Sequence, residues 1–336
     1  MDVLSDVLKV IRLNGAVYLN AEFSAPWCVE AQYGLHTAAS KLPQGNHVVF
    51  FHFLLDGRCS ARLVDGSETV ELATGDVILF PHNSLHLLGS DPQLVPATSE
   101  AVLDQSGRDG LVQMTYGGSG EKTHFVCGYL ACDRRICRPL FSSLPEMLRV
   151  ALGGTPATAW ILDLLRVGVQ ESLAQKPGAG SLLSKLSELM FVEAMRRYAL
   201  SLPADQKGWL AGLRDPYVGR VLGLMHTRPA DAWTVDGLAR KVALSRSALA
   251  ERFTDLIGEP PMQYLTRWRL ALAAQALQSG SEGIGSIGAR CGYDSEPAFN
   301  RAFKREFDTT PAAWRRNSRS GAQAAAPART RKRSGR

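Results

Sequence analysis

Residues 234–253 read TVDGLARKVALSRSALAERF and carry the pattern of a helix-turn-helix. Leu238, Ala239 and Val242 form the apolar face of a first short helix. Ser245 is placed to cap a second helix, because its hydroxyl can accept a hydrogen bond from an amide in the first turn of that helix. The small side chain of Ala239 lets the two helices cross closely. The stretch therefore predicts two short helices joined by a tight turn.

A second stretch, residues 284–307, repeats this pattern. Apolar residues precede a turn at Gly292, Ser295 follows as a cap, and residues 296–307 predict the second helix of the unit. Between the two units, Pro260–Ser279 predicts one helix of about 30 Å, close to the roughly 34 Å between major-groove faces one DNA turn apart. One chain can thus place two recognition helices in successive grooves.

Charge is distributed unevenly along the 336 residues. Residues 1–214 are net −3, residues 215–316 net +3 and residues 317–336 net +6, so an acidic partner would meet the C-terminal part. Six cysteines are too few for a disulfide scaffold, and 45% hydrophobic residues predict globular folding. Because no apolar run is long enough to span a bilayer and the first residues lack a signal-peptide pattern, we expect a cytoplasmic protein with no membrane partner.

The N-terminal part of the chain alternates short apolar runs with turn signals such as Asp56-Gly57 and Asp65-Gly66. This texture predicts a β-sandwich or barrel after a short helix within residues 3–13. An exposed loop is expected over residues 89–110. The predicted strands cover residues 16–23, 47–55, 59–64, 77–80, 111–116 and 123–132.

The periodicity becomes helical after Pro139. Residues 159–173 and 182–200 predict two amphipathic helices in an antiparallel hairpin, and residues 201–214 predict a linker. Leu182, Leu186, Leu189 and Met190 form a stripe on the second helix, which we expect to be a dimer interface, with packing inside the chain as the alternative. Residues 317–336 contain no acidic residue and predict a disordered basic tail.

Residues 215–316 resemble the DNA-binding domain of the AraC/XylS family of bacterial transcription regulators. The resemblance implies a protein that binds promoter DNA and alters transcription by contacting RNA polymerase. An activator is expected, although the sequence does not distinguish activation from repression. Its motif residues are Leu238-Ala239, Ser245–Leu249, Arg252-Phe253, Gly258–Met262, Tyr264-Leu265, Arg269, Ala289–Ser295, Phe299, Arg301–Lys304 and Thr310-Pro311.

Residues 3–200 resemble the cupin-type sensor domain of one branch of that family. The branch also resembles regulators that respond to reactive chlorine or other electrophiles. The expected fold is multi-domain α+β, with a cupin-like β-barrel over 1–137, a helical hairpin over 138–200, the linker over 201–214, an all-α domain with two helix-turn-helix units over 215–316 and the tail over 317–336. The motif residues are Ala25–Trp27, Phe51–Phe53, Gly75–His82, His86, Cys127-Gly128, Pro139-Leu140 and Leu144-Pro145.

The resemblance also implies which residues contact DNA. Base-reading positions lie on the exposed faces of the two recognition helices, while Lys304 and Arg305 are better placed for phosphates. Ala250 and Glu251 stand where related regulators often have longer or basic side chains, so we expect the first helix either to discriminate less between bases or to read cytosine through Glu251. The other expected DNA-binding residues, including the capping serines Ser245 and Ser295, are Ser245, Arg246, Ser247, Ala250, Ser295, Glu296, Pro297, Asn300 and Arg301.

Histidines in the predicted barrel are candidate metal ligands. His52, His82 and His86, with His47 nearby in sequence, could converge on a transition metal or zinc inside the barrel. The usual cupin pair of histidines one residue apart is missing, so hydrogen-bonded core histidines and no cofactor are the main expectation. A metal-dependent cupin oxygenase with an appended helical domain remains the alternative to a non-enzymatic regulator.

Five of the six cysteines lie in the sensor half, which makes a thiol switch a candidate mechanism. Cys127 and Cys132 share one predicted strand and point to opposite faces, so they cannot bridge. Cys132 and Cys137 flank a turn with two arginines that could lower a thiol pKa, and they are the first choice for a disulfide. Cys28, expected in a loop, is the solitary alternative, and Cys291 is expected in an inert core position. A small organic ligand in the barrel, or cysteines that only pack, fit the sequence as well.

Overall fold

A computed structural model describes residues 3–11, 13–32, 46–66, 68–98, 111–153, 156–203 and 205–324. The chain divides into two compact units. We call residues 11–211 the sensor unit, after the domain that the sequence resembles, and residues 212–336 with residues 1–10 the helical unit. Across the described ranges, no helix is both long enough and apolar enough to span a bilayer.

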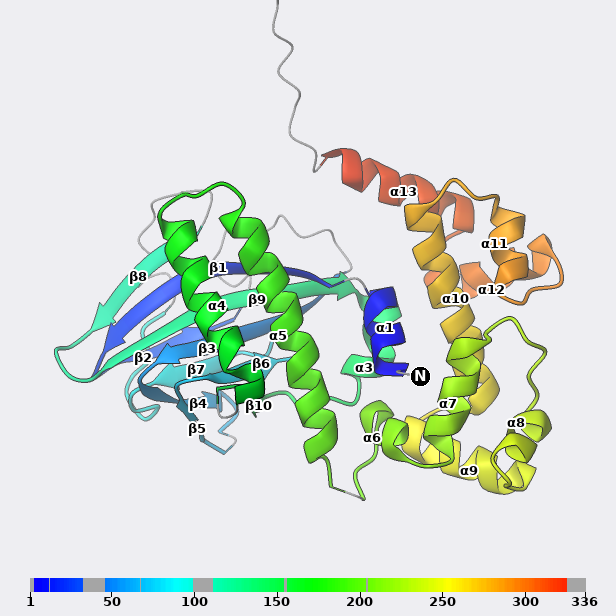
Figure 1. Ribbon diagram of the computed structural model, residues 1–336, viewed down its shortest axis with the longest axis horizontal. Helices are drawn as coiled ribbons and strands as arrows, with labels where there is room; N and C mark the ends of the chain where they lie inside the picture. The colour runs from blue at the N-terminus through cyan, green and yellow to red at the C-terminus, as the bar shows by residue number, and fades with distance from the viewer. Residues whose placement is uncertain are drawn as a thin grey trace, which may run out of the picture. The chain divides into compact units, whose positions relative to one another are not determined.

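The sensor unit is built on two β-sheets (Figure 1). The six-stranded sheet has the order β10-β6-β3-β9-β1-β8, and the four-stranded sheet has the order β2-β7-β4-β5. Buried side chains from both sheets form one core between them, so the expected barrel is a sandwich of two sheets rather than a closed barrel. The strands are β1 (Asn14–Ser24), β2 (Cys28–Ala31), β3 (Asn46–Asp56), β4 (Arg58–Leu63), β5 (Val70–Ala73), β6 (Asp76–Phe80), β7 (His86–Gly89), β8 (Val112–Gly117), β9 (Lys122–Asp133) and β10 (Leu148–Ala151).

Strand β3 reads as a nearly continuous apolar run because both of its faces are buried. Phe50 and Leu54 point into the core between the sheets, whereas Phe51 and Phe53 point to the opposite face and are also fully buried. Since side chains alternate along a strand, His52 lies on the same face as Phe50 and is placed in the core between the sheets.

Helices cover the outer face of the six-stranded sheet (Figure 1). The helices α4 (Pro156–Leu173) and α5 (Ala179–Ser201) lie side by side as an antiparallel pair, and α5 packs on β1 and β9. The predicted hairpin is therefore confirmed. A shorter helix, α3 (Arg134–Phe141), starts directly after β9, where the Asp133 carboxylate accepts a hydrogen bond from the Arg135 amide at 2.9 Å.

The helical unit includes a helix from the beginning of the chain, α1 (Val3–Ile11). Its residues Val3, Leu4, Val7 and Val10 are buried, and the Lys9 carbonyl accepts a hydrogen bond from Gln275 Nε2 at 2.9 Å. The other helices are α6 (Trp209–Arg214), which crosses the boundary between the units, α7 (Val218–Thr227), α8 (Val235–Lys241), α9 (Arg246–Ile257), α10 (Pro261–Ser279), α11 (Ile284–Arg290), α12 (Glu296–Phe307) and α13 (Pro311–Ala324).

Helices extend into two segments that were predicted to be a linker and a tail. The linker over 201–214 contains α6, whose Trp209 is buried, so this segment packs as part of the fold. The tail expected to be disordered from residue 317 begins as the last turns of α13, and residues 325–336 lie outside the described ranges. The described part of the expected loop over 89–110 ends at residue 98.

Candidate nucleic-acid interface and sensor core

The first helix-turn-helix consists of α8 and α9. Thr234 Oγ1 accepts a hydrogen bond from the Gly237 amide at 3.0 Å, and Ser245 Oγ accepts one from the Ala248 amide at 3.2 Å. Both helices therefore begin at side-chain caps, as the sequence predicts. Ala239 is buried at the crossing of the two helices, together with Leu238, Leu249 and Phe253.

The second helix-turn-helix consists of α11 and α12 and is built in the same way. Ser295 Oγ accepts a hydrogen bond from the Ala298 amide at 3.4 Å, which begins α12 at the predicted residue. The turn passes through Gly292 with a φ of +82°, a conformation that favours glycine. Phe299 and Phe303 fill the core under α12. Helix α10 joins the two helix-turn-helix units and is about 28 Å long at 1.5 Å per residue.

Most of the expected DNA-binding residues lie on the surface of α9 and α12. Ala250 and Asn300 are half-buried. Ser245 and Ser295 are exposed but their hydroxyls cap the helices, as described above. The remaining expected residues are all exposed: Arg246, Ser247, Glu251, Glu296, Pro297, Arg301, Lys304 and Arg305.

These exposed side chains differ in their partners within the protein. Arg246 Nη1 lies 3.6 Å from an Asp236 carboxylate oxygen in an exposed pair. The Glu296 carboxylate lies against α11, where a Cβ on Gly285 would come within 2.7 Å of it. Arg301 forms no hydrogen bond or ion pair with the described residues, so its guanidinium is available to a ligand.

Arg252 is held by the protein and belongs to the scaffold of α9. Its Nε donates to an Asp215 carboxylate oxygen at 2.9 Å, and its guanidinium lies 5.2 Å from the centre of the Tyr217 ring. Asp215 also accepts hydrogen bonds from the Tyr217 and Val218 amides, which begin α7. Burial alone would raise the pKa of Asp215, but these hydrogen bonds, led by Arg252, lower it. Sequence reasoning assigned Arg252 only to the family motif, because its acidic partner lies far away in the chain.

The sensor core contains a buried chain of hydrogen bonds through His52, His86 and Cys127. His86 Nδ1 donates to the Ser84 carbonyl at 2.8 Å, which leaves His86 Nε2 as an acceptor. His52 Nε2 therefore donates to His86 Nε2 at 2.7 Å, and His52 Nδ1 accepts from the Cys127 thiol at 2.8 Å. Every group is neutral in this arrangement. Burial lowers the pKa of His86 to about 3, lowers that of His52, and raises the pKa of Cys127.

The three histidines expected to bind a metal do not converge. His82 Nε2 donates to the Leu144 carbonyl at 3.1 Å, while His52 and His86 contact each other. His47 Nε2 lies 2.6 Å from the Pro81 carbonyl. Within the described part of the chain, no three His, Cys, Asp or Glu side chains are grouped to hold a metal ion. The structure therefore does not bring the three expected ligands together, because His82 lies in a turn outside the core.

The six cysteines are all free and buried. Cys132 on β9 forms a hydrogen bond with the thiol of Cys137 on α3, and Cys137 Sγ lies 3.7 Å from the Arg134 carbonyl. Burial and the Cys137 thiol raise the pKa of Cys132, so the expected lowering by arginines does not occur. Cys28 begins strand β2 instead of lying in a loop. Cys291 is buried in the second helix-turn-helix, and burial raises its pKa to about 11.

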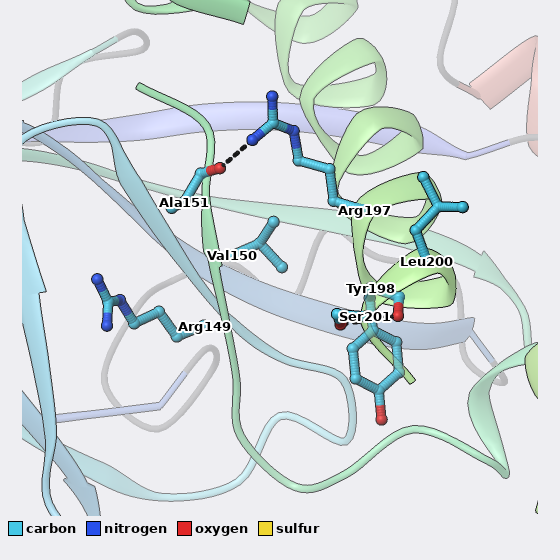
Figure 2. Close-up of a pocket in the computed structure, with 7 residues that line it drawn as sticks. All are labelled: Arg149, Val150, Ala151, Arg197, Tyr198, Leu200 and Ser201. Atoms are coloured by element: carbon cyan, nitrogen blue, oxygen red, sulfur yellow. Dashed lines mark hydrogen bonds between the residues drawn. The ribbon is translucent and has the colours of Figure 1, made fainter. Parts of the chain in front are cut away.

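A surface cavity of about 410 Å³ lies in the sensor unit between β10 and the C-terminal part of α5 (Figure 2). Arg197 on α5 donates from Nη1 to the Ala151 carbonyl at 2.7 Å and ties the two elements together. Val150 and Leu200 supply apolar surface, and the ring of Tyr198 is drawn below Ser201 in this view. None of the residues expected to bind metal or to react with oxidants lines this cavity.

The apolar stripe expected at a dimer interface lies mainly inside the sensor unit. Leu186 is 4% exposed and Met190 is 0% exposed, so these residues belong to the core and the expectation for them is wrong. The exposed apolar residues on the hairpin are instead Trp160, Leu164 and Val167 on α4, with Leu189 on α5. The three α4 residues are spaced by four and three positions and therefore share one face.

Comparison with known proteins finds family matches for both parts of the chain. A cupin family matches residues 2–199, and a helix-turn-helix domain family matches residues 238–317. A putative AraC-like transcription regulator of Streptomyces lividans is 31% identical over 94% of this chain and 99% of its own length. The RCS-specific HTH-type transcriptional activator RclR of Escherichia coli K12 is 29% identical over 95% of this chain and 99% of its own length.

Among solved structures, the DNA-binding domain of AdpA in complex with a target DNA is 28% identical over 32% of this chain and 95% of that chain, with a TM-score of 0.31. The family matches cover both units, and the AraC-like relative is similar over nearly the whole chain. The protein therefore belongs to the AraC-type DNA-binding transcriptional regulators that carry a cupin domain at the N-terminus.

Proposed function

We propose that the chain binds promoter DNA by placing α9 and α12 in two successive major grooves, and that its sensor unit regulates transcription by RNA polymerase through this contact. The observation that carries the proposal is the matched pair of capped recognition helices on one joining helix of about 28 Å. Each recognition helix presents exposed side chains that the fold does not need for its own packing.

The exposed residues suggest a division of roles. Arg301 has no partner within the described chain and is suited to a guanine edge, where an arginine donates two hydrogen bonds. Glu251 is suited to accept from the amino group of cytosine. Lys304 and Arg305, in the last turn of α12, are suited to phosphates. The exposed pair of Arg246 with Asp236 is weak, so DNA can compete for Arg246.

Selection of binding sites from random DNA, followed by footprinting, tests this proposal. We expect a bipartite site whose two half sites lie one helical turn apart on the same face of the duplex. Glu251→Ala should relax base preference in one half site, and Arg301→Ala should relax it in the other. A footprint confined to one half site, or a loss of preference in the same half site for both variants, would contradict a two-helix reading mode.

For the sensor, we propose that oxidation of Cys132 and Cys137 to a disulfide changes DNA binding. The hydrogen bond between the two thiols supports this pair, because it already holds the sulfur atoms together. With hypochlorous acid as oxidant, two thiols and one HOCl give one disulfide, water, a proton and chloride. The name of the RCS-specific relative suggests an oxidant as one class of effector to test first.

We also propose that the regulator is a cytoplasmic homodimer that activates transcription and has no enzymatic role. The exposed face of Trp160, Leu164 and Val167 on α4 is the surface that a second copy would cover, since soluble proteins rarely leave adjacent large apolar residues exposed. The separation of His82 from His52 and His86 weakens the alternative of a metal-dependent oxygenase. Metal content of the purified protein, measured beside turnover assays, tests that alternative.

A further inference from the structure

We propose that Arg269 fixes the placement of the two helix-turn-helix units relative to each other and thereby determines which spacing of DNA half sites the protein accepts. The inference rests on the proposed reading of DNA by both α9 and α12. It assigns Arg269 a positioning role, because its side chain holds protein segments together rather than touching DNA.

Arg269 lies at a junction between the two helix-turn-helix units. One side of this junction is the loop that leads from α7 to α8, the first helix of the first helix-turn-helix. Arg269 lies on α10, and its Nε donates to the Pro229 carbonyl at 2.6 Å. Its Nη2 donates to the Asp231 carbonyl at 2.8 Å. Two nitrogens of one guanidinium thus hold two carbonyls of the same short loop, which fixes the orientation of the loop as well as its distance from α10.

The other side of the junction is the turn of the second unit. A Cβ placed on Gly292 would lie 2.9 Å from Arg269 Cζ and 3.0 Å from the Ala230 carbonyl oxygen. The turn therefore contacts both the guanidinium and the loop that the guanidinium holds. Three segments meet at this point: the joining helix α10, the loop before the first helix-turn-helix, and the turn of the second.

This junction has a consequence for DNA recognition. Each recognition helix is packed on its own unit, so a shift between the units moves α9 relative to α12. Helix α10 alone leaves that movement partly free, because a helix constrains the units only where they pack on it. The contact of the loop and the turn across Arg269 removes this freedom, and a rigid pair of helices fits one spacing of half sites better than others.

A lysine at position 269 could not hold the loop in the same way. An ammonium group is a compact charge that cannot donate to two carbonyls in the fixed planar geometry of a guanidinium. Arg267 offers a matched control on the same helix, because it is partly buried and forms an ion pair with Glu259, which lies between α9 and α10 and not at the junction. Arg267→Lys perturbs a partly buried arginine without touching either the loop or the turn.

The experiment measures binding of the full chain to a set of operators with identical half sites and different spacing. Each inserted base pair moves one half site by about 3.4 Å and rotates it by about 35°. The wild type should prefer the native spacing over insertions of one or two base pairs by about tenfold or more. Arg269→Lys and Gly292→Ala should bind all spacings within about threefold of one another, whereas Arg267→Lys should keep the wild-type preference.

The ratio between operators does not depend on the fraction of folded protein, so a variant that is merely less stable keeps the wild-type ratio. Retention of the full spacing preference by Arg269→Lys and Gly292→Ala would overturn the inference. Loss of the preference in Arg267→Lys as well would also overturn it, since any damage to α10 would then suffice. If the wild type itself binds a single half site as tightly as the pair, the proposed two-helix function fails instead.

Discussion

Acid should destabilise the helical unit through His226, at the end of α7. The imidazole is buried, stacks on the Trp268 ring at a centroid distance of 3.9 Å, and makes a 2.8 Å hydrogen bond through Nε2 to the Tyr264 hydroxyl. Its Nδ1 has no hydrogen-bond partner among the described residues. Burial lowers the pKa of His226 from 6.5 to about 3, so the folded protein keeps this ring neutral.

The pKa difference between the folded and unfolded states sets the size of the effect. Below pH 6.5 the unfolded chain binds a proton at His226 that the folded chain does not bind, so the free energy of unfolding falls as the pH falls. Between pH 7 and pH 5 the expected loss is about 2 kcal/mol from this one residue. The loss continues to grow until the pH approaches the folded pKa of about 3.

Replacement His226→Gln removes the titrating group and keeps a side-chain amide that can reach the Tyr264 hydroxyl. Urea denaturation of wild type and variant at pH 7 and pH 5, followed by tryptophan fluorescence, gives the difference in unfolding free energy at each pH. That difference should change by about 2 kcal/mol in favour of the variant at pH 5. Tyr264→Phe is the matched control, because it removes the hydrogen bond but leaves His226 buried, so the pH dependence should persist. A difference that is the same at both pH values would refute the buried neutral histidine.

Three further outcomes are expected. Leu164→Glu should produce monomers in light scattering with an unchanged fold, whereas Leu186→Ala should cost about 2 to 5 kcal/mol of stability; a folded dimer in the first variant would exclude the α4 face. Arg301→Ala should weaken binding to the selected operator by about 1 to 3 kcal/mol and affect random DNA less, while an equal loss on both would indicate a phosphate contact. Mild hypochlorite should change operator affinity in the wild type but not after Cys132→Ser with Cys137→Ser, and mass spectrometry should find the disulfide; an identical response in both proteins would rule out the pair.

The helix-turn-helix units could be predicted closely from the sequence because their signals are local. Ser245 and Ser295 begin α9 and α12 at the predicted residues, since a cap acts on amides only three positions away. The short strands β2, β5, β7 and β10 were not predicted, because strands of four residues carry little alternation and are stabilised by partners far away in the chain.

The contacts among His52, His86 and Cys127 in the sensor core could not be predicted, because they depend on the register between strands that are distant in the sequence. His52 lies opposite Cys127 in the pairing of β3 with β9, although 75 positions separate them. His82 and His86 are four apart, a spacing that brings side chains together on a helix but not across a turn into a strand. Similarly, helical periodicity placed Leu186 on an apolar face without indicating whether a sheet or a second chain covers that face.

The membership of α1 in the helical unit has a consequence for the order of folding during synthesis. Helix α1 leaves the ribosome before the sensor unit, whereas the rest of its own unit begins only at residue 212. At 5 to 20 residues per second, synthesis needs roughly 13 to 50 s to pass from the end of α1 to the start of α10. During that time Val3, Leu4, Val7 and Val10, which are buried in the finished protein, remain open to chaperones or to other nascent chains. The helical unit therefore completes its fold with a segment that is made before the sensor unit.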